Sequence, residues 1–184
     1  MLVNNSGTSW GADSLEAFPA KGWDKVLDLN LKSVFLCTQL ALPMLKRGAA
    51  LSDTSHYTGQ GNGGNVDGGS MHNVDPSRII NIGSVAGIGA GQPWRTYSYD
   101  ASKAAVHHLT RRLSHELAAS QITVNAIAPG VIPTSMSAQL ETYASAEDQA
   151  RAVPLQRLGA AEDIGGAALF LSSRAGSWVT GEGL

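Results

Sequence analysis

The chain has 184 residues, a length that suits one domain with a sizeable core. Hydrophobic residues make up 43% and charged residues 15%, which favours a folded, well-packed domain over a disordered chain. The formal net charge of −2 argues against a nucleic acid or an anionic membrane as partner, because both favour basic surfaces. No apolar run reaches the roughly 18 residues that a membrane span needs, and we expect a cytoplasmic location.

The content of cysteine and histidine excludes two further kinds of site. Cys37 is the single cysteine, so an internal disulfide cannot form, and we expect it to be a small buried hydrophobic residue. The five histidines do not predict a metal site. His107 and His108 are adjacent and point to different faces of a helix, and His115 has no carboxylate or cysteine at ligand spacing.

The first predicted elements are a short strand and a long helix. Met1 to Val3 indicates a buried strand that ends in the loop Asn4–Gly7, and because a domain seldom begins inside a core strand, we expect the chain to be truncated there. A helix is predicted from about Gly22 to Arg47. Its expected packing stripe follows the three- and four-residue spacing of Val26, Leu29, Ser33, Cys37, Leu40, Ala41 and Met44.

A glycine-rich segment separates this helix from the rest of the chain. Residues 49–77 lack hydrophobic periodicity and are predicted to form a flexible inserted loop. Within it, Gly59–Gly64 matches the pattern Gly-x-Gly-x-x-Gly. We do not interpret this match as a dinucleotide site, because no strand precedes it and no amphipathic helix follows it.

Strands and helices alternate through the second half of the chain. This alternation predicts an α/β fold in which helices cover both faces of a parallel sheet, in a single domain over residues 1–184. The predicted elements are a strand at Arg78–Gly83, a helix at Thr96–Ala119, a strand at Ile122–Ile127, helices at Ser137–Ala152 and Ala161–Ser173, and a strand at Trp178–Gly181.

Polar residues follow three of these strands. Ser84 ends the second strand, while Asn4–Gly7 and Pro129–Thr134 follow the first and the third. Ligands of open α/β sheets bind outside the carboxyl ends of the strands, so these segments are expected to meet at one site. Tyr99 and Lys103 stand four residues apart on a helix and share one face, although such a pair is a weak signal by itself.

Taken together, these motifs resemble the short-chain dehydrogenase/reductase family, in its classical type. The resemblance covers nearly the whole chain except the glycine-rich segment, and it is most detailed toward the rhamnolipid-type 3-oxoacyl-[acyl-carrier-protein] reductases. The matching segments are Asn4–Gly7 (with Ser6 where the family usually has Ala), Asn30, Gly83–Gly87, Tyr99–Lys103, Pro129–Thr134 and Pro154–Ile164.

The resemblance implies a Rossmann-type fold and hydride transfer between NADPH and a carbonyl or alcohol substrate, such as a 3-oxoacyl thioester or a similar ketone. Tyr99 is then the general acid, and Lys103 favours its phenolate and binds the nicotinamide ribose. Ser84 donates a hydrogen bond to the substrate oxygen. Asn30 holds a water that returns protons through Lys103, whereas by itself it indicates only a helix residue beside the core.

The resemblance also implies a cofactor-binding set. NADP is favoured over NAD by the subgroup alone, because the strand whose end selects between them is not found in this sequence. For Thr134 the structural alternative is a helix N-cap, a role that is compatible with cofactor binding, and Trp10 and Trp94 are either substrate-pocket residues or packing anchors. The set comprises Asn5, Ser6, Gly7, Tyr99, Lys103, Pro129, Gly130, Ile132 and Thr134.

The sequence departs from the family in one important respect. The turn Thr-Gly-x-x-x-Gly-x-Gly, whose backbone amides hold the cofactor pyrophosphate, is not found. We therefore expect a partial domain, truncated at both ends, that is inactive alone but derives from an active reductase. The alternative is a non-catalytic fragment or dimerising pseudo-enzyme. The family pairs the helices that carry Asn30 and Tyr99, which implies a homodimer or homotetramer for the whole protein.

Overall fold

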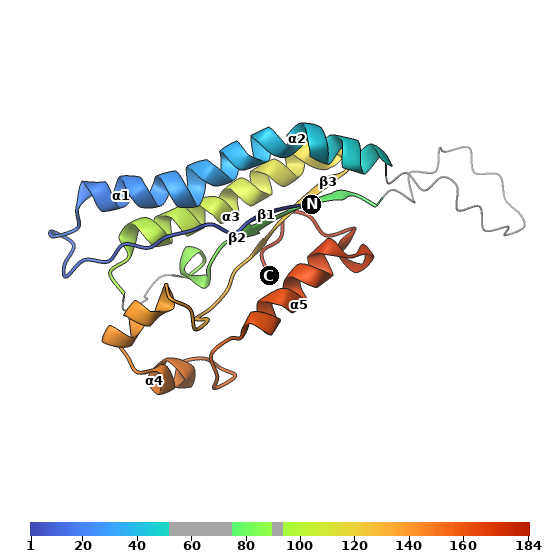
Figure 1. Cartoon of the computed structure of the whole chain (residues 1–184). Helices are drawn as coiled ribbons and strands as arrows, with labels where there is room; N and C mark the ends of the chain where they lie inside the picture. The colour runs from blue at the N-terminus through green and yellow to red at the C-terminus, as the bar shows by residue number, and fades with distance from the viewer. Residues whose placement is uncertain (52–74, 90–93) are drawn as a thin grey trace, which may run out of the picture.

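The computed structural model describes residues 1–51, 75–89 and 94–184. Its centre is a parallel sheet of β1 (Leu2–Asn4), β2 (Ser77–Ile82) and β3 (Ile122–Ile127), in that order (Figure 1). The predicted α/β fold class is thereby confirmed. Most of the glycine-rich segment, including Gly59–Gly64, lies outside the described residues. Within the described ranges, no helix combines the length and apolar character that crossing a membrane requires.

Helices cover both faces of this sheet. On one side, α1 (Ala20–Leu27), a π-helical turn (Asp28–Lys32) and α2 (Ser33–Leu51) form one continuous helical segment beside α3 (Tyr97–Leu117) (Figure 1). On the other side lies α5 (Ala161–Ser172). The smaller elements are α4 (Ala146–Arg151) and 3₁₀ turns at Val85–Gly87, Ala118–Ser120, Ser137–Thr142 and Arg174–Gly176.

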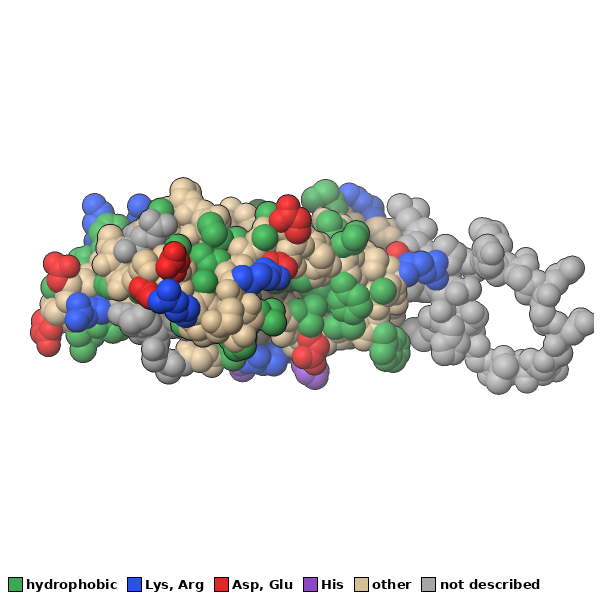
Figure 2. Space-filling view, turned by 90° about the horizontal axis from the view of Figure 1, so that it is seen from below, with side chains coloured by type: hydrophobic (Ala, Val, Ile, Leu, Met, Phe, Trp, Pro, Cys, Tyr) green, Lys and Arg blue, Asp and Glu red, His purple; other side chains and the backbone are tan. Residues whose placement is uncertain are grey.

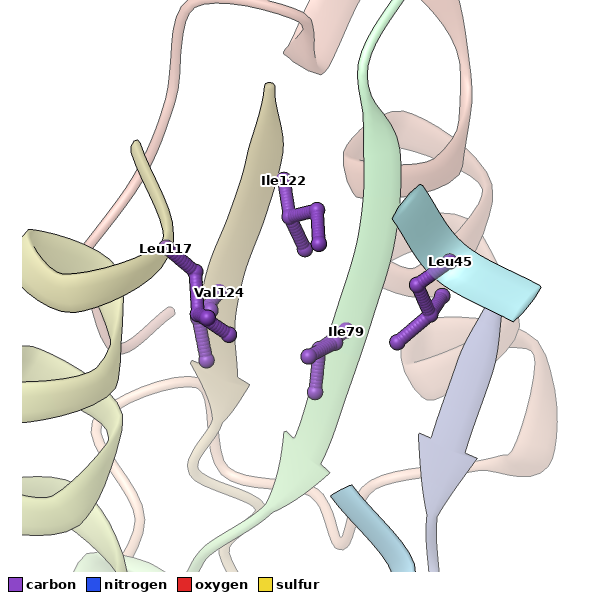
Figure 3. Packing of buried hydrophobic residues seen from close by; sticks show 5 residues of the cluster. All are labelled: Leu45, Ile79, Leu117, Ile122 and Val124. Atoms are coloured by element: carbon purple, nitrogen blue, oxygen red, sulfur yellow. The ribbon is translucent and has the colours of Figure 1, made fainter. Parts of the chain in front are cut away.

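The core is divided by the sheet because neighbouring strand residues point to opposite faces. Ile79 is fully buried toward α2 and α3, and its neighbour Ile80 is buried toward α5. Figure 3 shows the first of the two clusters, formed by Leu45, Ile79, Leu117, Ile122 and Val124. The second cluster contains Ile80, Ile127 and Leu171.

The predicted packing stripe of the first long helix is wrong over most of its length. Leu40 and Met44 are 76% and 63% exposed, and Cys37 is exposed rather than buried. The buried face instead carries Val26, Asn30, Val34, Thr38 and Leu45. Two of these five side chains are polar and form hydrogen bonds inside the protein, so apolar periodicity selected the wrong face.

The helix predicted at Ser137–Ala152 is also wrong, because two short elements occupy this range. A 3₁₀ turn ends at Thr142 and α4 begins only at Ala146. Between them Ser145 has extended backbone, and its Oγ accepts a hydrogen bond from the Asp148 amide at 3.2 Å. A serine in this conformation starts a new helix rather than continuing an old one.

The last predicted strand, Trp178–Gly181, is not formed as a strand. The Val179 amide donates to Gly176 O within a turn, and pairing with β3 begins only at Gly181, whose φ is 83°. From there Gly181 N donates to Val124 O at 2.8 Å and Leu184 N donates to Ala126 O at 3.0 Å. The C-terminal segment therefore lies along β3, a few residues later than the sequence pattern predicts.

Charged side chains of both signs are mixed on the face that carries α4 and α5 (Figure 2). Arg151 pairs with Glu147 and Asp148, and Arg157 pairs with Asp163, all at exposed positions. Such surface pairs contribute little to stability. Their interspersed charges do not form the basic stripe that a nucleic-acid partner would require on this face.

Two leucines of α5 test the described packing. Leu171 is fully buried, whereas Leu169 on the same helix is 69% exposed. We expect Leu171→Ala to lower the free energy of unfolding by about 2–5 kcal/mol because it leaves a cavity. Leu169→Ala is expected to change it by less than about 0.5 kcal/mol. Denaturant unfolding of both variants checks this, and equal losses would show that the described core is wrong.

Candidate active site

The carboxyl ends of the three strands open into one cleft of about 750 Å³. The parallel register places Asn4, Asn81 and Ala126 side by side, so the segments that follow them emerge at the same edge of the sheet. Every predicted site residue except Asn30 lines this cleft. The lining includes Asn5, Ser6, Gly7, Ser84, Tyr99, Lys103, Pro129, Gly130, Ile132 and Thr134.

Ser84 is fixed in extended backbone directly after β2. Its φ and ψ are −171° and 153°, and it caps the 3₁₀ turn Val85–Gly87. The Ala86 amide donates to Ser84 Oγ at 3.1 Å. Because this amide occupies only an acceptor site, the Ser84 hydroxyl keeps its own hydrogen as a donor, and Tyr99 lies within its reach.

Tyr99 lies in the first turn of α3, within hydrogen-bonding reach of Ser84. Burial raises the pKa of Tyr99 above its ordinary value of 10.0, the side-chain hydrogen bond with Ser84 lowers it, and the charge of Asp100 raises it. The net effect keeps the phenol protonated. A protonated hydroxyl beside Ser84 is the arrangement that a proton donor needs.

Lys103 lies one helical turn beyond Tyr99 and is 4% exposed. Its Nζ donates to Ile82 O at 2.7 Å and lies 5.6 Å from the centre of the Tyr99 ring. Burial lowers the pKa of Lys103 from 10.5 to about 8, so the ammonium remains the main form near neutral pH. Lys103 is the one charged side chain among the described residues that line the cleft.

Asn30 lies behind the cleft, in the π-helical turn, and is 1% exposed. Its Oδ1 accepts from the Thr8 amide at 2.8 Å, and its Nδ2 donates to Thr8 O at 2.9 Å and to Ser102 Oγ at 3.0 Å. The side chain thus joins the loop after β1 to α3. A π-turn is an uncommon helix irregularity that often occurs at functional sites.

The segments at either end of the cleft complete its polar lining. Gly7 lies close to the catalytic side: a Cβ at this position would lie 3.5 Å from Asn30 Oδ1 and 3.7 Å from Lys103 Nζ. Thr134 is exposed and forms reciprocal bonds with Ser137, whose amide donates to Thr134 Oγ1 at 3.2 Å. The N-cap interpretation of Thr134 is nevertheless wrong, because the following 3₁₀ turn begins at Ser137 and its N-cap is Met136. Thr134 lies among the residues that line the cleft.

The two tryptophans considered for the substrate pocket differ in position. Trp94 lines the cleft, whereas Trp10 packs against Gly22 of α1 and is not among the lining residues. The cleft also contains apolar residues that the sequence did not predict for the site, because their spacing follows no common pattern and only the folded chain brings them together. They include Leu29, Val85, Val131, Met136, Leu140 and Ile164. The described residues contain no group of His, Cys, Asp and Glu that could hold a metal ion.

The lowered pKa of Lys103 predicts an unusual pH dependence of stability. Between about pH 8 and pH 10 the unfolded chain holds a proton that the folded chain has released, so the free energy of unfolding should rise with pH. Above pH 10 the raised pKa of Tyr99 reverses this trend. Urea unfolding across this range checks it: Lys103→Met should remove the rise, and an unchanged rise in that variant would contradict the assignment.

Comparisons with known proteins agree with this geometry. The family model described as enoyl-(acyl carrier protein) reductase matches residues 66–184, and the model described as short chain dehydrogenase matches residues 1–62. The chain is 41% identical over 183 residues to the rhamnolipids biosynthesis 3-oxoacyl-[acyl-carrier-protein] reductase of Pseudomonas aeruginosa. It is 38% identical to the 2-dehydro-3-deoxy-D-gluconate 5-dehydrogenase of Bacillus subtilis. Each alignment covers 98% of this chain, but 62% and 60% of the relative.

Solved structures show the same relationship. The Pseudomonas aeruginosa RhlG/NADP active-site complex superposes with a TM-score of 0.81 at 40% identity, covering 100% of this chain and 62% of that one. A structure of ElxO with NADP bound gives a TM-score of 0.77 at 25% identity and covers 63% of that chain. The chain thus spans about three fifths of the length of the proteins it matches. It belongs to the short-chain dehydrogenase/reductase family.

Proposed function

We propose that this chain forms the catalytic part of an NADPH-dependent carbonyl reductase. The observation that carries the proposal is the placement of Ser84, Tyr99 and Lys103 on one wall of a single cleft, with Asn30 directly behind them. The side chains come from different elements. In the contact of Ser84 with Tyr99, a proposed proton donor, Tyr99, lies beside a hydrogen-bond donor, Ser84, as carbonyl reduction requires.

The cleft fits the nicotinamide half of the cofactor. Lys103 supplies a positive charge, and no carboxylate is found among the described lining residues to repel an anion. Gly7 and Ile132 both line this space, and the resemblance to the family implies that the ribose would contact Lys103 and the carboxamide would contact Ile132 and Thr134. The choice of NADPH rests on two similar structures that were solved with NADP bound.

In the proposed reaction, bound NADPH supplies a hydride to a carbonyl carbon. Tyr99 transfers its phenolic proton to the carbonyl oxygen, while the Ser84 hydroxyl donates a hydrogen bond to the same oxygen as it gains negative charge. The Lys103 ammonium then favours the phenolate that remains. Asn30 donates both of its amide hydrogens, to Thr8 and Ser102, so its proposed role is to fix the loop after β1 against α3. A water beside Lys103 would return the proton.

The lining of the cleft favours an acyl substrate. The two relatives compared act on an acyl thioester and on a sugar acid. A polyhydroxylated substrate requires several hydrogen-bonding partners, whereas Leu29, Trp94 and Met136 present apolar surface. We therefore propose a 3-oxoacyl thioester, or a ketone of similar shape, as the substrate.

Replacing the proposed proton donor tests this function. In the whole protein, Tyr99→Phe should lower kcat for 3-oxoacyl thioester reduction by at least about 10³-fold, because no hydroxyl remains to protonate the oxygen. NADPH affinity should change by less than about threefold. Tyr97→Phe is the matched control, because Tyr97 begins the same helix but packs on Phe18, with ring centres 5.5 Å apart. Substantial turnover by Tyr99→Phe would refute the role of Tyr99.

A second feature concerns assembly. The exposed face of α2, defined here by Leu36, Leu40 and Met44, is apolar over more than two turns, with exposed fractions of 42%, 76% and 63%. A contiguous exposed apolar strip commonly marks a protein interface. We propose that a second copy of the protein covers it. This strip also favours the non-catalytic alternative, a dimerising fragment, because pairing needs no cofactor.

Charge on this strip should separate the copies. Leu40→Glu is expected to convert a dimer or tetramer into a monomer, because a buried unpaired carboxylate is costly. Leu155→Glu is the matched control, since Leu155 is equally exposed at 76% but lies after α4. Light scattering coupled to size-exclusion chromatography measures the mass. An unchanged assembly in Leu40→Glu, or a monomeric unmodified protein, would exclude α2 as the interface.

A further inference from the structure

His107 extends the row of side chains that faces the end of β2. It follows Tyr99 and Lys103 at intervals of four residues and is 5% exposed. Its Nε2 lies 3.3 Å from the Ser84 amide nitrogen and 3.0 Å from the Ser84 carbonyl oxygen. The ring thus contacts the backbone of Ser84 on both sides of its Cα.

The neighbouring hydrogen bonds decide which of these two contacts is needed. The Ser84 carbonyl already accepts from the Gly87 amide at 3.0 Å. For the buried Ser84 amide, Nε2 of His107 is the acceptor. A buried amide without an acceptor is costly, whereas a carbonyl with one donor is satisfied. The hydrogen-bond inventory therefore places the ring proton on Nδ1 and leaves the Nε2 lone pair for Ser84.

Gly83 makes room for this contact. A Cβ at position 83 would lie 2.5 Å from His107 Nε2, well inside van der Waals contact. The Nδ1 side of the ring faces the C-terminal segment, where a Cβ at Gly183 would lie 3.4 Å away. The imidazole is thus held between the end of β2 and the segment that lies along β3, with no space to turn away from Ser84.

We propose that neutral His107 is a positioning residue, which fixes the backbone of Ser84 through Nε2 and so aims the serine hydroxyl at the substrate oxygen. The ring does not line the cleft, so it acts through Ser84 rather than on the substrate. The catalytic consequence rests on the proposed reductase function, whereas the hydrogen bond itself does not.

The ring state can be measured directly in the unmodified protein. In ¹⁵N-labelled protein the His107 ring nitrogens should show a protonated Nδ1 and an unprotonated Nε2 at neutral pH. The Ser84 amide should exchange slowly with solvent. A proton on Nε2, or rapid exchange of the Ser84 amide, would overturn the proposal whether or not the protein has reductase activity.

Three variants then test what the contact does. His107→Leu removes the acceptor at similar volume, and His107→Gln places an amide oxygen near the position of Nε2. His108→Leu is the matched control, because His108 is exposed on the same helix. We expect Ser84 amide exchange to accelerate at least tenfold in His107→Leu, to stay slow in His107→Gln, and to be unchanged in His108→Leu.

Kinetics separate positioning from general structural support. His107→Leu should lower kcat by roughly 10²-fold, the size of effect expected for a misplaced catalytic group, with little change in KM for NADPH. His107→Gln should recover most of kcat. Equal activity of the Leu and Gln variants would overturn the proposal. Absence of activity in the whole, unmodified protein would count against the reductase function alone, and the ring and amide measurements would still decide the role of His107.

Discussion

The contact between α3 and the segment that ends β2 is the interaction on which the rest of the site depends. Lys103 Nζ donates to Ile82 O, and the backbone at Gly87 approaches α3 so closely that a Cβ there would lie 2.6 Å from Ala104 N. Only glycine permits this approach. Gly83, directly before Ser84, also lies against α3, so Ser84 stands between two glycines that both contact this helix. One helix therefore carries the proposed proton donor Tyr99, the positive charge of Lys103 and the ring of His107 that contacts the serine backbone.

Buried polar side chains align the layers behind this contact. Asn4 Nδ2 donates to Asn81 Oδ1 at 2.8 Å, and Asn81 Nδ2 donates to Thr110 Oγ1 at 2.9 Å. Asn4 also reaches Thr38 on α2 at 3.3 Å. A network of this kind crosses from β1 through β2 to α3 and specifies one register, because a shift would leave several buried polar groups unsatisfied. This network complements the two apolar clusters, because apolar contacts alone are less specific for one register of the strands and helices.

The sequence predicted which residues line the cleft better than it predicted the packing. Sheet geometry places Ser84 at the ligand-binding edge, whereas Tyr99 and Lys103 are singled out by the resemblance to the family, since their helical spacing alone is a weak signal. The buried face of α2 could not be predicted in this way, because Asn30 and Thr38 are buried through hydrogen bonds that only the folded chain provides. The contact of His107 with Ser84 could not be predicted for the same reason, since its hydrogen-bond partner is a backbone group that no sequence pattern reveals.

Local hydrogen bonds also explain the two elements that were wrongly predicted. The break before α4 depends on the conformation of Ser145, and the late start of the C-terminal pairing depends on the positive φ of Gly181. In both cases the backbone conformation of one residue ends or delays an element that the hydrophobic pattern predicts. The resemblance to the family, in contrast, rests on many separated motifs, and the family match over both parts of the chain agrees with it.

The central claim is that hydride passes to a carbonyl carbon at the wall formed by Ser84, Tyr99 and Lys103. Deuteride transfer measures this step most directly: the whole protein is incubated with a 3-oxoacyl thioester and NADPH in which both C4 hydrogens are deuterium, and the product is analysed by mass spectrometry. One deuterium is expected on the carbon that bears the new hydroxyl. Product without deuterium, or no product at all from the natural assembly, would contradict it and favour a dimerising role without catalysis.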